Sequence, residues 1–121
     1  METYIQHPLP DRVVELIAHR LAALAEPMRI KVLDHLRERG EASVLEIAAA
    51  VGARHANVSR HLNVLYGAEI VGRRKAGTKV MYRIADPAIF RLCEEVCGGL
   101  ITERHRELDA LLNPNPEEAA A

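Results

Sequence analysis

Apolar residues recur at intervals of three and four along most of the chain, the spacing that gives an α-helix one hydrophobic face. The pattern predicts about five helices, over segments 11–24, 27–39, 43–65 (two short helices joined by a turn) and 86–112. Asp11 and Asp86 are the expected caps of the first and last helices. The apolar face expected for segment 27–39 consists of Ile30, Val32, Leu33 and Leu36. Over 70–84 the period changes, because Val80, Tyr82 and Ile84 alternate with polar residues as in a half-buried strand. Ala76-Gly77-Thr78 divides that stretch as a turn. The sequence therefore predicts a mainly α fold with one two-stranded β-hairpin.

The two short helices within 43–65 have clear end signals. Ser43 followed by Glu46 is a capping box, in which each side chain accepts a backbone N–H of the first turn. Gly52 can take the left-handed conformation that ends helices. The second helix has an apolar stripe and a basic, amide-rich polar side, whose side-chain types bond phosphates and base edges in the major groove. A helical hairpin in a core would share the apolar pattern, so this segment alone leaves both interpretations open.

Charge is distributed unevenly along the chain. The whole sequence has 16 Lys and Arg against 17 Asp and Glu, a net charge of -1. Residues 54–83, however, carry seven Lys and Arg against one acid, Glu69, a local balance of +6, which leaves -7 for the remainder. This basic segment covers the second short helix and the hairpin, as in a nucleic-acid-binding surface. The length of 121 residues fits one domain.

Composition disfavours several other classes of protein. There is no basic stretch followed by an apolar run, and no apolar stretch approaches the ~18 residues that span a bilayer, so we expect a cytoplasmic chain with no membrane partner. The two cysteines are expected to be free thiols in a reducing compartment. No acid pair, nucleophile–base arrangement or phosphate-binding loop is visible. We therefore do not expect an enzyme.

Three motifs stand in order along the chain: LAEPMRIKVLDHL (24–36), VSRHLNVLYGAEIV (58–71) and GRRKAGTKVMYRI (72–84). They resemble the opening segment, recognition element and wing of the ArsR/SmtB family of metal- and stress-responsive repressors, over roughly residues 11–110. The resemblance implies a winged helix-turn-helix that dimerises through its first and last helices and binds a twofold double-stranded operator. We expect an N-terminal arm (1–10), a DNA-binding and dimerisation domain (11–112) and a disordered tail (113–121).

The resemblance also implies which residues meet DNA. Ser59 and His61 fall at the family's recognition positions, and further candidates from the same helix are Arg54, His55, Asn57, Arg60 and Asn63. From the wing, contacts with phosphate or the minor groove are expected from Arg73, Arg74, Lys75, Thr78 and Lys79. Two alternatives remain, namely that the wing charges are only solvated and that His61 is a buried structural histidine.

Two residues depart from the family pattern. Arg54 stands where the recognition helix usually opens on Ser or a similar cap, so the start of this helix is less well fixed. Glu69 replaces the usual Gly after the helix, which costs roughly 1 kcal/mol if the backbone there is left-handed. Both departures concern local geometry and leave the predicted fold unchanged.

The family's usual effector sites are mostly missing. Glu41-Ala42-Ser43-Val44 stands where many members have a cysteine, and the last helix has Asp86 but Ala88, Gly99 and Thr102 at the further positions of the zinc pattern, so a zinc or nickel site of that type is not expected. Cys93 and Cys97 remain, four residues apart on the last helix.

Helix geometry limits what this cysteine pair can do. Residues four apart have Cβ atoms about 5–6 Å apart, whereas a disulfide needs about 3.5–4.5 Å. Two thiolates at that spacing can share a thiophilic metal or metalloid ion, with a third ligand from the arm or the partner chain. A longer bridge made by reactive sulfur species would also fit, and so would simple packing as small hydrophobes.

The expected function is a homodimeric, sequence-specific repressor released from its operator by a thiol-directed signal, with no required cofactor. The alternatives are a regulator whose cysteines are only structural and which has another effector or none, or a winged helix that binds protein or RNA.

Overall fold

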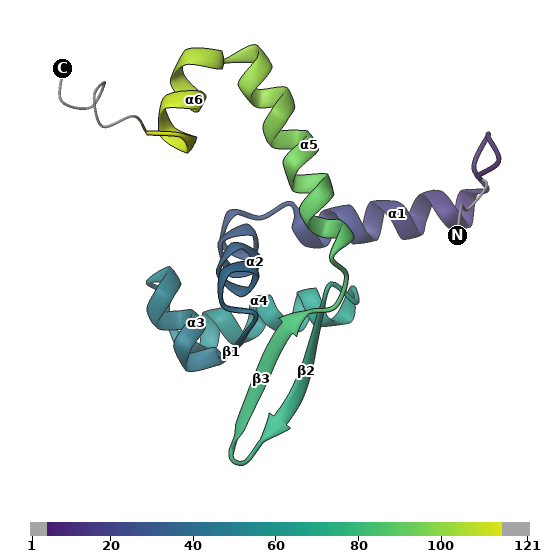
Figure 1. Cartoon of the computed structure of the whole chain (residues 1–121). Coiled ribbons are helices and arrows are strands. Elements are labelled where there is room, and N and C mark those ends of the chain that lie inside the picture. Colours follow the sequence, from purple (N-terminus) through teal and green to yellow (C-terminus); the bar gives the residue numbers. More distant parts are fainter. Residues whose placement is uncertain (1–4, 115–121) are drawn as a thin grey trace. The chain divides into compact units, whose positions relative to one another are not determined.

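The computed structural model describes residues 5–114, so residues 1–4 and most of the predicted tail lie outside the described residues. The chain divides into two units, Met1–Asp86 and Pro87–Ala121, which are described separately. The first contains α1 (Asp11–Leu24), α2 (Pro27–Arg39), β1 (Glu41–Ser43), α3 (Val44–Val51), α4 (His55–Gly67), β2 (Val71–Ala76) and β3 (Lys79–Ile84) (Figure 1). The second contains α5 (Ala88–Glu103) and α6 (His105–Leu112).

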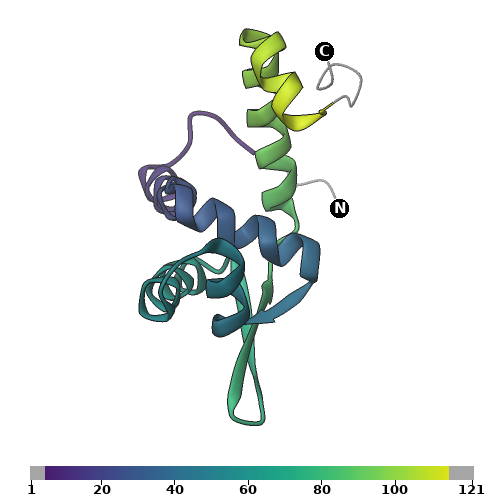
Figure 2. The same cartoon turned by 90° about the vertical axis from the view of Figure 1, so that its left-hand side faces the viewer.

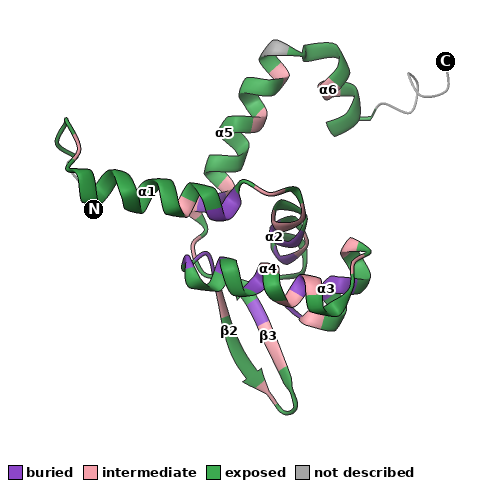
Figure 3. Ribbon diagram, turned by 180° about the vertical axis from the view of Figure 1, so that it is seen from behind, coloured by how far each residue is buried: buried purple, intermediate pink, exposed green. Residues whose placement is uncertain are grey.

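The core of the first unit forms where α2, α3, α4 and the sheet meet (Figure 3). The predicted stripe of α4, made by Val58, Leu62 and Leu65, is fully buried there. Most of the predicted apolar face of α2 is also buried, but Ile30 was wrongly placed on it, because its side chain is 50% exposed. The buried stripe fixes the rotation of α4 about its axis, so its polar side must face away from the core.

The predicted helix-end signals of the helix-turn-helix are confirmed. The Ser43 hydroxyl accepts a hydrogen bond from the Glu46 N–H at 3.2 Å, and the Glu46 carboxylate accepts one from the Ser43 N–H at 3.3 Å. Gly52 ends α3 in the left-handed conformation. Arg54 precedes α4 without a side-chain capping bond, and Glu69 has the left-handed backbone that the sequence suggested, with φ 61°. The cap of α1 was predicted one residue late, because Pro10 takes the N-cap position.

The hairpin is confirmed, but the sheet has a third strand that the sequence did not predict. Its antiparallel order is β1-β3-β2. β2 and β3 are paired from Val71 with Ile84 to Ala76 with Lys79, and Gly77 takes a positive φ of 64° in the turn between them. Figure 2 shows this hairpin, the wing, projecting from the helices of its unit. β1 leads directly into α3, since Ser43 is both the last residue of the strand and the N-cap of the helix.

The predicted last helix is two helices. Arg104, with φ -126° and ψ 43°, leaves the helical region and separates α5 from α6. The described part of the chain therefore has six helices instead of the expected five. Asp86 was predicted to cap the last helix, whereas Pro87 takes the N-cap position and Asp86 accepts a hydrogen bond from Arg20 at 2.6 Å. None of the helices in the described residues is long and apolar enough to cross a membrane.

Candidate DNA-binding interface

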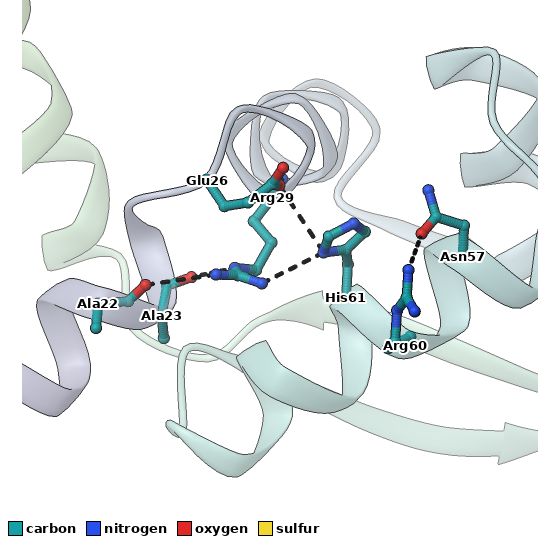
Figure 4. Close-up of polar contacts among 7 residues, drawn as sticks. All are labelled: Ala22, Ala23, Glu26, Arg29, Asn57, Arg60 and His61. Carbon is teal, nitrogen blue, oxygen red and sulfur yellow. Dashed lines mark hydrogen bonds and ion pairs between the residues drawn. The ribbon is translucent and has the colours of Figure 1, made fainter.

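The polar side of α4 carries most of the residues that the sequence assigned to DNA. Arg54, His55, Arg60 and Asn63 are exposed, whereas Asn57, Ser59 and His61 are half-buried. Arg60 donates a hydrogen bond through Nη2 to Oδ1 of Asn57 at 2.7 Å (Figure 4). This bond holds the guanidinium along the helix surface without neutralising its charge. The exposed members thus form one basic, amide-containing surface on α4.

His61 lies differently from its neighbours on α4. Its side chain is only 12% exposed, and its Nδ1 is 3.4 Å from Nη1 of Arg29 and 3.8 Å from Oε2 of Glu26 (Figure 4). Glu26 also caps α2, because its carboxylate accepts the N–H of Arg29 at 3.0 Å. His61 is therefore tied to the start of α2 through Nδ1. Glu26 and Arg29 lie in the first sequence motif (24–36), but no local pattern there indicates a role for them.

Arg73 and Arg74, the base arginines of the wing, both have partners inside the protein. The Arg73 guanidinium stacks over the Tyr66 ring at 3.9 Å, and its hydrogen bond with Tyr82 raises the pKa of Arg73. Arg74 donates to both carboxylate oxygens of Glu41, at 2.8 and 2.6 Å, which lowers the pKa of Glu41. One arginine thus connects the wing with α4, and the other connects it with β1.

The tip of the wing presents a different set of side chains. Lys75 and Lys79, the tip lysines, flank the turn at Gly77, and they are exposed together with Thr78. Neither lysine forms an ion pair within 4.0 Å to another described residue. The predicted wing contacts therefore fall into two classes, cations engaged at the base and cations open to a partner at the tip.

Comparison with known proteins identifies the family. Residues 24–74, from the end of α1 into β2, match a helix-turn-helix domain family. The chain is 39% identical over 110 residues to the HTH-type transcriptional regulator KmtR of Mycobacterium tuberculosis, which covers 86% of this chain and 84% of KmtR. The chain belongs to the ArsR/SmtB family. It is accordingly a winged helix-turn-helix, DNA-binding transcriptional regulator, as the three motifs predicted.

Solved structures of the ArsR/SmtB type show the same fold. A homodimeric winged helix-turn-helix DNA-binding domain from Mycobacterium bovis, described as a possible ArsR-family transcriptional regulator, superposes with a TM-score of 0.68 at 30% identity, over 87% of this chain and 94% of that one. The antimony-specific transcriptional repressor AntR superposes with a TM-score of 0.65 at 28% identity, over 88% of this chain and all of AntR.

This ArsR/SmtB protein has two free cysteines on α5. Cys93 is exposed and Cys97 is half-buried, and exposed apolar side chains of the same helix surround them in sequence, namely Leu92, Val96 and Leu100. Among the described residues, no three His, Cys, Asp or Glu side chains gather into a metal-binding group. The pair itself supplies two soft donors, the ligand type that thiophilic ions prefer.

α1 presents an apolar face that the rest of its unit leaves open. Val14, Leu16, Ile17 and Leu21 are each between 44% and 52% exposed. Large side chains at this spacing form one contiguous stripe along a helix. A stripe of this kind on a small protein marks an association surface.

Proposed function

We propose that this protein is a homodimeric repressor that binds a twofold operator in duplex DNA and releases it when a thiol-directed signal acts on Cys93 and Cys97. The observation that carries the DNA-binding part is the exposed basic and amide side of α4, joined to a wing whose tip presents lysines that have no ion pair with another described residue. No resident cofactor is needed for either part.

The packing of α4 defines how it meets DNA. Its apolar stripe is fully buried, so only the side with His55, Arg60 and Asn63 can enter the major groove. Asn63 can pair with adenine in that groove, where a good bidentate pair discriminates by about 1–3 kcal/mol, and Arg60 is assigned to the phosphate backbone. The tip lysines contact phosphate on the flank. His61, whose side chain is only 12% exposed, is left out of the proposed groove contacts.

Dimerisation supplies the second half-site. The exposed apolar stripe of α1 and the exposed apolar residues of α5 form the contact with a second copy. The Mycobacterium bovis domain, which is homodimeric, supports the existence of a homodimer. Two recognition helices then read half-sites about 34 Å apart, one turn of DNA. A small change in the relation of the two protomers breaks this match.

The thiol-directed part rests on the accessibility and spacing of the cysteine pair. An exposed and a half-buried thiol, four residues apart on one helix, can share a thiophilic ion or take up a sulfur bridge. The antimony-specific repressor AntR supports a metalloid signal. A coupling free energy of about 1–3 kcal/mol is typical between an effector site and a second site. A third ligand comes from the arm or the partner chain.

The test begins with an operator selected in vitro from random duplexes. Wild type and the Cys93→Ser, Cys97→Ser double variant are then titrated with it, before and after treatment with antimonite, arsenite, cadmium or polysulfide. We expect both proteins to bind, only the wild type to release, and intact-protein mass spectrometry to show the adduct only on wild type. Release of the double variant by the same inducer would contradict the thiol switch.

The same selection tests DNA binding itself. If no duplex is enriched by the wild-type protein, the repressor proposal is wrong, and binding to single-stranded RNA or to a protein becomes the alternative to measure. If duplex binding is normal and no thiol reagent releases it, the cysteines only pack, and the effector is another molecule or none.

A further inference from the structure

Arg29 stands where three helices of the first unit meet. Its Nε donates to the carbonyl oxygen of Ala23 at 2.6 Å, and its Nη2 lies 3.4 Å from that of Ala22. Both carbonyls belong to the last turn of α1, where a helix carries a partial negative charge, and the Ala22 carbonyl also accepts the N–H of Ala25 at 3.2 Å. Figure 4 shows the same guanidinium reaching from α2 toward His61 on α4. One side chain therefore contacts α1, α2 and α4.

The chemistry of this contact limits how the His61 ring can bond to Arg29. An arginine has five N–H donors and no acceptor, so a hydrogen bond across the 3.4 Å between Nη1 of Arg29 and Nδ1 of His61 requires Nδ1 as the acceptor. Glu26 lies 3.8 Å from the same Nδ1 and fixes the Arg29 backbone through its capping bond. The ring of His61 thus faces Arg29 of α2 and the N-cap residue of that helix, Glu26.

We propose that Arg29 and His61 are positioning residues that hold the recognition helix α4 in a fixed relation to the end of α1, and that His61 acts through Nδ1 on α2 rather than by reading DNA. This rests on the proposed DNA-binding function. The contrast within α4 supports it, since Arg60 and Asn63 are exposed while the His61 side chain is 12% exposed.

The network has a consequence for regulation. α1 carries the exposed apolar stripe assigned to the dimer contact. Its C-terminal residues Ala23 and Leu24 are buried, and Arg29 binds the carbonyl of Ala23. A movement of α1 is transmitted to α4 because Arg29 contacts both. Arg29 and His61 therefore link the proposed dimer surface on α1 with the recognition helix α4 inside one protomer.

Amide variants distinguish positioning from DNA contact. Asparagine places a polar atom near the position of Nδ1, and glutamine places one near that of Nε2, so His61→Asn preserves the bond toward Arg29 and His61→Gln does not. Operator affinity is measured by fluorescence anisotropy over a range of KCl concentrations. We expect His61→Gln and Arg29→Gln to weaken operator binding about tenfold, with an unchanged slope of log K against log salt, and His61→Asn to stay near wild type.

The matched control is Arg60→Gln on the same helix. Arg60 is a proposed DNA contact, so its loss should lower the salt slope by about 1 per protomer. Arg29→Lys, which keeps the charge but loses the planar fork, should weaken binding as Arg29→Gln does. A cooperative thermal transition in every variant confirms that they are folded, and the Arg29 and His61 variants should also bind random duplex as the wild type does.

Three results would overturn the inference. The first is a salt slope that falls in the Arg29 or His61 variants as it does in Arg60→Gln. The second is an operator affinity that stays near wild type in His61→Gln but not in His61→Asn. The third is wild-type operator affinity in all of the variants. Failure of the wild-type protein to bind any selected duplex would instead overturn the proposed function, so the two failures are distinguishable.

Discussion

The division of the wing into a tip and a base predicts which cations control the salt dependence of DNA binding. The tip lysines have no ion-pair partner within 4.0 Å among the described residues, whereas Arg73 is held by Tyr66 and Tyr82, and Arg74 by Glu41. Replacing Lys75 and Lys79 with Gln removes two phosphate contacts from each protomer. Replacing Arg73 with Gln removes a guanidinium that is already engaged inside the protein.

The magnitude follows from counting charges. Each phosphate contact contributes about 0.9 to the slope of log K against log salt. Arg54, Arg60 and the two tip lysines give about eight phosphate contacts in the dimer, and hence a wild-type slope of about -7. With this slope the affinity falls on the order of 10⁴-fold between about 50 and 200 mM salt. The double tip variant removes four of these eight charges and should reduce the slope to about -3.6. Arg73→Gln should leave the slope near -7, by the same relation.

The assay is fluorescence anisotropy of the labelled, selected operator in a KCl series. Lys31→Gln on α2 is the matched control, because it removes an exposed lysine outside the basic segment. The reasoning is refuted if the tip variant keeps the wild-type slope, or if Arg73→Gln lowers the slope as much per residue as a tip lysine does. Salt-insensitive binding of the wild type would refute the phosphate-contact picture as a whole.

Three further predictions concern the fold that supports the site. Leu62→Ala should lower the free energy of unfolding in urea by about 2–5 kcal/mol, because the side chain is fully buried; a loss below about 1 kcal/mol would contradict the assigned core. Glu69→Gly should raise it by about 1 kcal/mol, since φ is 61°, whereas Glu69→Ala should give no gain. Hydrogen bonds from Ser43 lower the pKa of Glu46 below 4.5, so this stabilisation is complete above that pH and is lost as the carboxyl protonates. The stability difference between wild type and Glu46→Gln should therefore shrink as the pH falls to about 3, and a constant difference would contradict it.

Local sequence signals predicted the parts of the fold that depend on nearby residues. The capping box at Ser43, the buried stripe of α4 and the hairpin turn at Gly77 are set by residues within a few positions of each other. The left-handed backbone of Glu69 could also be anticipated, because the family pattern has glycine at this position after the recognition helix. The family assignment rested on the same local motifs.

The parts that the sequence did not predict depend on pairing between distant residues or on very short elements. β1 is three residues long, too short to show an alternating pattern, and it exists because β3 is available as a partner. The bond between Arg74 and Glu41 joins residues 33 positions apart. The break at Arg104 has neither Gly nor Pro to mark it. The number of charged side chains in the basic segment could be counted from the sequence. The residues that these side chains bind within the protein could not be predicted from it.

The continuity of β1 with α3 limits the conformational changes by which the protein can release DNA. Ser43 ends the strand and caps the helix, so no spacer residue separates β1 from α3, and β1 is itself paired with β3 of the wing. We therefore expect the helix-turn-helix and the wing of one protomer to move together. Inducer binding should accordingly leave hydrogen exchange within β1 and α3 unchanged, while the distance between matching probes on the two protomers shifts.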